Sequence, residues 1–373
     1  MTRPTRARIS RSALSANLAR VRAAAPGCRV IAVVKANAYG HGLLPVARAL
    51  ARTDAYAVAR VEEALALREA GLAHPVLLLE GPLAPADLDQ AARFHLDLVI
   101  HSDEQLGMLA HYRGPARFTL WLKFDTGMHR LGFPLETFDA VLSRVKSLSC
   151  VARPLRLMTH LACAEERDHP HTRRQLEHIR STLSARGCDL SVANSAAVLT
   201  LPETLQSPRA ATDAPTTPCN WVRPGLMLYG ISPLPGRDAG AVGLLPAMNF
   251  ETRLIALRRV ATGESVGYGA TWTAARDSLV GIAAAGYGDG YPRGLPSGTP
   301  VLVDGHRAPL AGRISMDMLA VDLTDHPGTP VVGDTVTLWG QGLPVERIAE
   351  AAGMIPYELV CGITQRVAME VVD

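Results

Sequence analysis

The strongest constraint on the fold is a regular alternation of short apolar runs with helical patterns over the first half of the chain. Runs rich in branched apolar residues lie at 30–34, 55–59, 75–79, 96–100, 118–123 and 155–160, with amphipathic stretches at 43–52, 61–70 and 85–93. Such short, nearly continuous apolar runs are typical of strands buried on both faces of a parallel sheet. The alternation therefore predicts a parallel α/β fold.

Among parallel α/β folds, the sequence favours a (β/α)8 barrel of the TIM type. No Gly-x-Gly-x-x-Gly segment follows the first apolar run, which counts against a dinucleotide-binding unit. In a barrel, functional groups gather where the strands end. Lys35, Lys123 with Asp125, and His160 each end a predicted strand, so a barrel would bring them to one mouth. For any one of them, a polar residue that simply ends a strand is an equally good interpretation.

The pattern changes after about residue 233. Strand-like runs at 250–260, 279–285, 300–303, 318–323 and 335–339 are separated by Gly, Asp and Pro turns, and one helix is expected at 345–352. We predict a barrel over 1–233 and a mainly β domain over 234–373. Residues 203–220, rich in Pro, Thr and Ala, are expected to form a surface loop of no assigned function.

Charge and cysteine usage exclude several classes of protein. The chain of 373 residues has 38 Lys plus Arg against 35 Asp plus Glu, a net charge of +3 that gives no reason to expect nucleic acid as a partner. The six cysteines form no Cys-x-x-Cys pair, so neither a metal site nor a disulfide framework is expected. Without a signal peptide or a long apolar run, we expect a cytoplasmic protein with no membrane partner.

Lys35 is the first candidate for covalent chemistry. Burial at a strand end lowers the pKa of a lysine toward that of a nucleophilic amine, although a lysine whose ammonium group reaches solvent at the barrel rim is the simpler alternative. Its surroundings, Val-Val-Lys-Ala-Asn-Ala-Tyr-Gly-His-Gly at 33–42, resemble the pyridoxal-phosphate attachment segment of alanine racemases. Further segments resemble that family in the same order, at 123–132, 159–164, 194–197, 222–230, 266–271, 286–293, 312–317 and 356–358.

The resemblance implies an isomerase that interconverts L- and D-alanine with pyridoxal 5'-phosphate by a two-base mechanism, with peptidoglycan synthesis or D-alanine catabolism as its role. Lys35 would carry the cofactor and act as one base. Tyr268 of the other subunit would be the second, in a head-to-tail homodimer with shared active sites. A phenol needs help to lose its proton near neutral pH, and His160 and Arg223 are the expected helpers. The first few residues would pack with the second domain.

The resemblance also assigns the remaining site residues. Arg223 would face the pyridine nitrogen, which should then stay unprotonated, because a guanidinium keeps its protons. Arg130 and the Met316 amide would bind the substrate carboxylate, with Lys123 carbamylated to orient Arg130. The phosphate would be held by Tyr39, Ser195, Gly225, Leu226 and Tyr357, although Ser195 also suits a helix start. The access corridor would be lined by Tyr287, Arg293, Arg313 and Asp317.

Three alternatives stay open. A serine-type or broader amino-acid racemase would share the fold and differ in pocket width. A decarboxylase on a similar scaffold fits the segments at 222–230 and 266–271 less well. A non-catalytic pyridoxal-phosphate carrier would lack the second domain, in which Tyr268 and Met316 lie.

Overall fold

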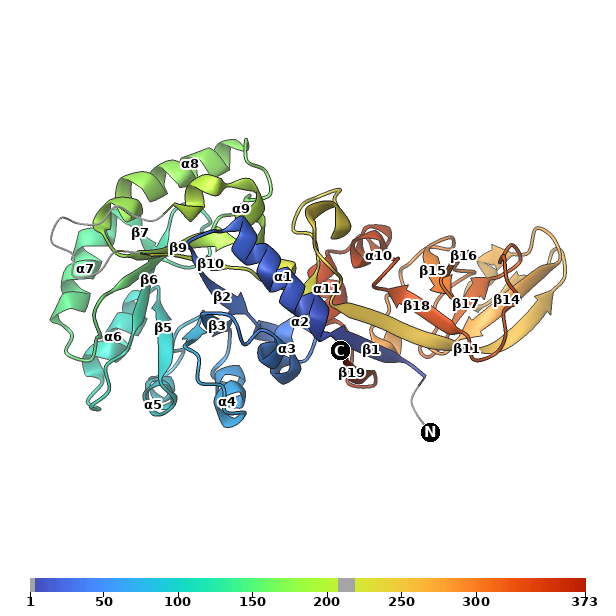
Figure 1. Cartoon of the computed structure of the whole chain (residues 1–373), viewed down its shortest axis with the longest axis horizontal. Helices are drawn as coiled ribbons and strands as arrows, with labels where there is room; N and C mark the ends of the chain where they lie inside the picture. Colours follow the sequence, from blue (N-terminus) through green and yellow to red (C-terminus); the bar gives the residue numbers. More distant parts are fainter. Residues whose placement is uncertain (1–3, 207–218) are drawn as a thin grey trace.

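The computed structural model describes residues 4–206 and 219–373, and its first sheet is a closed parallel barrel (Figure 1). Parallel pairing joins neighbouring strands all the way round, through β2–β10 and β5–β6. The barrel strands are β2 (Arg29–Val33), β3 (Ala55–Val58), β4 (Val76–Leu78), β5 (Leu96–Ile100), β6 (Leu120–Asp125), β8 (Arg156–Met158), β9 (Asp189–Asn194) and β10 (Asn220–Arg223), with the short β7 (Phe133–Pro134) beside β6. The predicted (β/α)8 barrel is confirmed.

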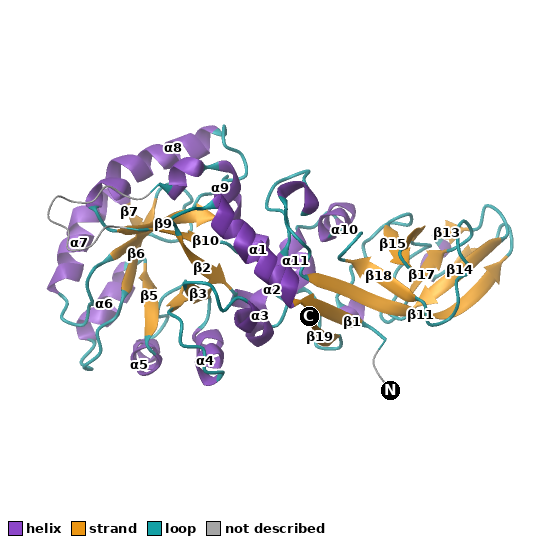
Figure 2. Cartoon of the chain, in the orientation of Figure 1, coloured by secondary structure: helices purple, strands orange, loops and turns teal. Residues whose placement is uncertain are grey.

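Helices form the outer layer of the barrel, as Figure 2 shows in purple. Apolar side chains such as Leu67, Leu88 and Val141 face the strands, which explains why amphipathic segments fold here. The helices are α1 (Arg11–Ala24), α3 (Leu43–Ala49), α4 (Val61–Glu69), α5 (Pro85–Phe94), α6 (Asp103–His111), α7 (Phe138–Ser147), α8 (Pro170–His178) and α9 (Ser195–Thr200), together with one unusual turn, α2 (Lys35–Tyr39).

The rest of the chain forms the mainly β domain expected from the sequence. One sheet has the order β16-β15-β18-β11-β1-β19, with β14 and β17 attached through β11. Its strands are β1 (Arg6–Ser10), β11 (Met248–Val260), β14 (Ser278–Ala283), β15 (Pro300–Val303), β16 (His306–Pro309), β17 (Leu319–Asp322), β18 (Thr335–Trp339) and β19 (Ala368–Val372). A two-stranded ribbon, β12 (Ser265–Val266) with β13 (Trp272–Thr273), and the helices α10 (Val345–Ala352) and α11 (Pro356–Cys361) complete it.

The two ends of the chain meet in this second sheet. β1 pairs antiparallel with β11 and parallel with β19, so the N-terminal strand lies in the second sheet between two segments that are far away in the sequence. Ser10 ends β1 and its hydroxyl caps α1, which packs against the barrel. The sequence boundary at residue 233 stays a prediction.

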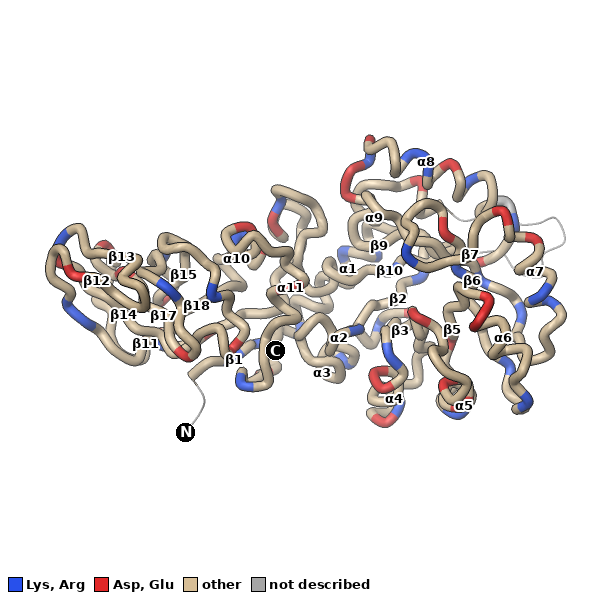
Figure 3. The backbone as a smooth tube through the Cα atoms, turned by 180° about the vertical axis from the view of Figure 1, so that it is seen from behind, with Lys and Arg blue, Asp and Glu red and all other residues tan. Residues whose placement is uncertain are grey.

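Several expectations need correction. The predicted series began at residue 30, so β1 and α1 were missed. At the two ends of the expected loop at 203–220, a 3-10 turn covers Pro202–Leu205 and β10 begins at Asn220. Residues 207–218 of the expected loop lie outside the described residues. None of the helices in the described part of the chain is long and apolar enough to cross a bilayer. Acidic and basic residues both occur along the outer helices α4, α5 and α8, as the red and blue segments of the tube in Figure 3 show.

Candidate active site

A cavity of about 510 Å³ opens at the carboxyl ends of the barrel strands. Its walls come from the ends of β2, β3, β4, β6, β8, β9 and β10 and from α11 of the second domain. This arrangement gathers side chains from segments far apart in the sequence, as barrel topology requires. Ten of the residues predicted for the site line it: Lys35, Tyr39, Lys123, Arg130, His160, Ser195, Arg223, Gly225, Leu226 and Tyr357.

Lys35 is followed by one turn of left-handed helix. Ala36, Asn37 and Ala38 each have φ of 53°, and Tyr39 has φ of 51°. This conformation is unfavourable for residues with a Cβ, at roughly 1–2 kcal/mol each. Strain of this kind persists where the surroundings fix it, and it gathers at functional sites.

Glu63 on α4 fixes this turn. One carboxylate oxygen accepts from the backbone N–H groups of Ala36 at 2.6 Å and Asn37 at 3.4 Å. The other accepts from Ala59 at 3.0 Å and Arg60 at 3.2 Å, in the loop after β3. The Asn37 side chain in turn accepts from Leu43 N at 2.9 Å. One carboxylate therefore holds the loops after two adjacent strands, and it places Lys35 at the mouth.

Positive charge accumulates inside the cavity. Burial, reinforced by Arg223 and Arg130, lowers the pKa of Lys123 to about 8. Burial lowers the pKa of Arg223 to about 10, so the guanidinium still carries its proton at neutral pH. Asp125 at the end of β6 is turned to its own loop, where it accepts from the backbone of Gly127 and His129. The buried Lys123 and Arg223 and the half-buried Lys35 thus face a space suited to anions, and the exposed Arg130 lies at its edge.

Arg223 and His160 form a hydrogen-bonded pair on one wall. Nη2 of Arg223 lies 3.3 Å from Nδ1 of His160 and donates to the Thr159 carbonyl at 2.6 Å. Burial, followed by the charge of Arg223, lowers the pKa of His160 well below its usual value. His160 is therefore neutral at physiological pH, and its Nδ1 accepts the hydrogen bond from the guanidinium.

The opposite end of the cavity is a cradle of hydrogen-bonding groups. Ser195 Oγ accepts from Gly225 N at 2.9 Å and from Met227 N at 3.3 Å, while its hydroxyl hydrogen can turn to the cavity. A Cβ on Gly225 would lie 2.5 Å from Tyr39 Oη, so this close approach requires glycine. Small residues, hydroxyls and backbone N–H groups suit a phosphate dianion, and the predicted cofactor therefore fits the cradle.

The other predicted residues do not line this cavity. Tyr268, Tyr287, Arg293, Arg313, Met316 and Asp317 all belong to the second domain. The Tyr268 side chain is 70% exposed, on a 3-10 turn next to β12. Within a single chain the structure does not bring Lys35 and Tyr268 together.

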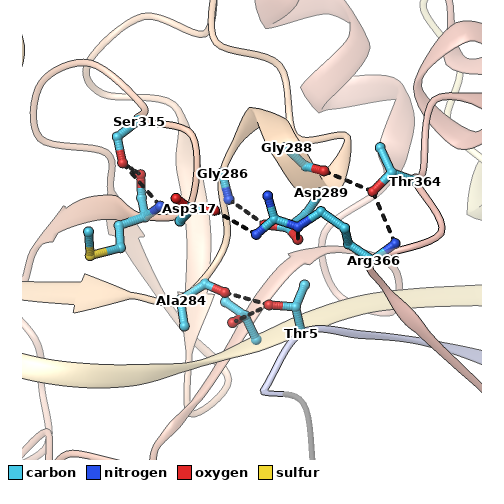
Figure 4. Close-up of polar contacts among 11 residues, drawn as sticks. Thr5, Ala284, Gly286, Gly288, Asp289, Ser315, Asp317, Thr364 and Arg366 are labelled. Atoms are coloured by element: carbon cyan, nitrogen blue, oxygen red, sulfur yellow. Dashed lines mark hydrogen bonds and ion pairs between the residues drawn. The ribbon is translucent and has the colours of Figure 1, made fainter.

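Two loops of the second domain are packed into one polar cluster, shown in Figure 4. Gly288 N donates to the Met316 carbonyl at 2.9 Å, which ties the Tyr287 turn to the Met316 loop. Arg366 joins the same loops from outside, with Nη2 at 2.6 Å from Asp317 and Nε at 3.4 Å from Asp289. Tyr287 and Met316 are thereby held on one exposed face.

Glu63, Asn37 and Arg366 were not predicted from the sequence. Glu63 follows the start of a helix, where an acidic residue is common for local capping reasons. Arg366 lies in a short loop before β19 with no motif around it. Their partners lie in other segments, so no local signal marks them.

Comparisons with known proteins agree with this geometry. The model for the alanine racemase N-terminal domain matches residues 9–233, and that for the C-terminal domain matches 247–371. The chain is 48% identical to an alanine racemase of Aeromonas hydrophila over 98% of this chain and 99% of the relative. An alanine racemase of Shewanella sediminis is also 48% identical, with 98% of both chains covered.

Solved structures agree in the same way. The crystal structure of biosynthetic alanine racemase from Pseudomonas aeruginosa has a TM-score of 0.91 at 46% identity, and 100% of both chains is covered. The alanine racemase structure from Acinetobacter baumannii has a TM-score of 0.87 at 35% identity, again over 100% of both chains. The chain belongs to the alanine racemase family.

Proposed function

We propose that this chain interconverts L-alanine and D-alanine with pyridoxal 5'-phosphate, as a homodimer whose active sites combine two subunits. The family is pyridoxal-phosphate-dependent. The observation that carries the proposal is the cavity in which Lys35 and the Ser195–Gly225 cradle face a common space. Lys35 would hold the cofactor covalently. Tyr39, Ser195, Tyr357 and the backbone N–H group of Leu226 would hold its phosphate, together with the Gly225 N–H group once it is released from Ser195 Oγ.

Racemisation requires a proton to leave Cα on one face and another to arrive on the opposite face. When bound, pyridoxal phosphate supplies the electron sink that makes the Cα–H acidic. The Lys35 amine would exchange the proton on one face, and the Tyr268 hydroxyl of the partner subunit on the other. The exposed position of Tyr268, away from its own chain's cavity, supports this division.

Arg223 and His160 would set the electrostatics of the site. A guanidinium that keeps its proton and faces the ring nitrogen would leave that nitrogen unprotonated, which weakens the electron sink and limits side reactions. The hydrogen bond from Arg223 to His160 would extend toward the Tyr268 hydroxyl and support its loss of a proton.

Substrate binding would use Arg130 and the Met316 amide of the partner, which together hold the carboxylate. Lys123 has a pKa of about 8, so part of it is free amine at neutral pH. A free amine can add carbon dioxide and release a proton, which yields a carbamate anion. This anion would orient Arg130 and relieve the repulsion among the cations of the cavity.

The second-domain residues Tyr287, Arg293, Arg313 and Asp317 would line a narrow access corridor in the dimer. A corridor narrowed by tyrosine and arginine side chains admits a methyl group more easily than a large side chain, which favours alanine over broader substrates. A cytoplasmic location and a role in supplying D-alanine for peptidoglycan stay predictions.

Mixed dimers test the shared site. Purified wild-type chain should convert L-alanine in deuterated water to D-alanine with deuterium at Cα, and serine measured in parallel tests the width of the pocket. Lys35→Ala and Tyr268→Phe should each abolish racemisation. Co-expression of the two variants should restore about a quarter of wild-type activity, because half of the dimers would contain one intact site.

The control for this experiment is Lys35→Ala co-expressed with a chain that carries both substitutions. No intact site can form from that pair. Two inactive variants that fail to complement each other, although mixed dimers form, would refute the division of the bases between subunits.

A further inference from the structure

The buried side chain of Gln175 on α8 joins two of the loops that form the cavity. Gln175 is 0% exposed. Its Nε2 donates to Thr126 Oγ1 at 3.1 Å and to the His160 carbonyl at 3.0 Å, and its Oε1 accepts from Ala162 N at 2.9 Å. Both amide hydrogens and the amide oxygen are therefore engaged, by two segments more than 30 residues apart.

The chemistry of these partners requires a primary amide in one orientation. A carbonyl oxygen accepts and a backbone N–H donates, so a flipped amide would place Oε1 against the His160 carbonyl and Nε2 against the Ala162 N–H. A carboxylate would likewise face the His160 carbonyl without a proton to donate. Leucine would fill the space and leave buried polar groups unpaired, which is unfavourable.

Both joined segments carry groups of the site. Thr126 directly follows β6, which contains Lys123, and Arg130 lies further along the same loop. On the other side, the amide holds the backbone of His160 itself. Thr126 Oγ1 also lies 2.9 Å from Thr159 Oγ1, and the Thr159 carbonyl accepts from Arg223.

Two histidines on the same face of α8 strengthen this attachment. His171 lies one turn before Gln175 and its Nε2 is 2.7 Å from the Gly127 carbonyl. His178 lies about one turn after it, with Nδ1 3.1 Å from the Thr126 carbonyl. At each of these contacts the ring nitrogen must be the donor, since a carbonyl can only accept. The face of α8 formed by 171, 175 and 178 is thus fitted to the loop after β6.

We propose that Gln175 is a positioning residue for racemisation. It sets the distance between the Thr126 loop and His160, and through His160 it sets the contact with Arg223. The inference rests on the proposed function and extends it to a side chain that does not line the cavity. Loss of the amide should lower kcat more than it changes KM, because two of its three hydrogen bonds end on His160 and Ala162, and the third ends on Thr126, four residues before Arg130.

The chain contains a matched control in Gln105 on α6, which is 3% exposed. Its Nε2 donates to the carbonyls of Glu80 at 2.9 Å and Pro82 at 3.2 Å, and its Oε1 accepts from His101 N at 2.9 Å. It therefore joins the loops after β4 and β5 and, like Gln175, donates two hydrogen bonds and accepts one from a backbone N–H group. Those loops carry none of the proposed reacting or binding groups, although Leu79 and Glu80 form part of the cavity wall.

The test compares Gln175→Leu with Gln105→Leu as holoenzymes. Both should show a similar drop in the midpoint of thermal unfolding, since each substitution leaves a buried backbone N–H group and at least one backbone carbonyl without the glutamine partner. Gln175→Leu should lower kcat about 10-fold or more and change the KM for alanine by less than about 3-fold, because small displacements of catalytic groups have large effects on rate. Gln105→Leu should keep kcat within about 2-fold of wild type.

A milder pair of variants keeps the test decisive if Gln175→Leu does not fold. Thr126→Val keeps the shape of Thr126 and removes the hydroxyl that accepts from Gln175, so kcat should fall, and Thr126→Ser should restore it. Equal losses of kcat for the two glutamine variants, or no loss in Gln175→Leu and Thr126→Val, would overturn the inference about Gln175 alone. A wild-type chain without racemase activity would instead refute the proposed function on which it rests.

Discussion

The left-handed turn after Lys35 can be tested by substitution with glycine. The backbone conformation there determines whether the substitution raises or lowers the free energy of unfolding. Ala36 has φ of 53° and an exposed side chain. At such a φ an alanine is strained by roughly 1–2 kcal/mol, whereas glycine is not. Glycine also gains conformational freedom in the unfolded chain, which offsets about 0.5–1 kcal/mol of that relief. Ala36→Gly should therefore raise the free energy of unfolding by about 0.5 kcal/mol.

The matched control is Ala16, an exposed alanine inside the right-handed helix α1. Ala16→Gly should lower the free energy of unfolding by about 1 kcal/mol, because no strain is relieved there. Urea unfolding of both variants and of wild type, at one protein concentration and with equal slopes, gives the difference of about 1.5 kcal/mol between them. If both substitutions lower the stability alike, the turn after Lys35 is not strained in the way we describe.

Four further predictions concern groups around the cavity. Glu63→Ala should lower the free energy of unfolding by about 1–3 kcal/mol in urea, because several backbone N–H groups lose their acceptor. Gly225→Ala should raise the Kd for pyridoxal phosphate about 10-fold in an absorbance titration, because its Cβ would displace the Tyr39 hydroxyl. Burial raises the pKa of Glu346 above its usual 4.5, so ionisation destabilises the fold as the pH rises through this range. Glu346→Gln should therefore have the higher thermal midpoint at pH 7, and the difference should disappear below the unfolded pKa of 4.5. Protein equilibrated with ¹³C-bicarbonate should give a carbamate carbon signal in NMR that Lys123→Ala lacks, and a spectrum without this signal in wild type would contradict carbamylation.

Much of the barrel could be predicted because its strands are buried on both faces. The run at 96–100 coincides with β5, and the runs at 30–34 and 55–59 overlap β2 and β3. A strand that is buried along its whole length appears in the sequence as a continuous apolar run. Such a run can be recognised without knowing which strands pair with it.

β1 shows what such runs miss. Arg6–Ser10 is short and alternates buried with partly exposed residues, and its partners β11 and β19 lie at the far end of the sequence. Its strand conformation depends on pairing that is not encoded locally. The same applies to the turn after Lys35, where four residues with positive φ include no glycine and are held by a carboxylate on another helix.

Side chains that hold other groups in position, such as Gln175, could not be predicted from the sequence for a related reason. Gln175 stands in a helix whose sequence, Pro-His-Thr-Arg-Arg-Gln-Leu-Glu-His, is polar enough to suggest full exposure. Its burial follows from the loops after β6 and β8, which present a carbonyl, a hydroxyl and an N–H to one point. A polar residue is buried where such partners converge, and convergence of separate loops is a property of the closed barrel rather than of any segment.

The proposed site is divided between the barrel cavity and an exposed face of the second domain. The N-terminal strand β1 helps to connect these two parts. β1 passes directly into α1 at Ser10, without an intervening linker, and pairs with both β11 and β19. α1 packs on the barrel, while β11 runs through the second sheet toward the ribbon beside Tyr268. The orientation of the Tyr268 face relative to the Lys35 cavity therefore depends in part on this short junction between β1 and α1. In the proposed dimer this orientation matters twice, because each subunit must present its face to the cavity of the other.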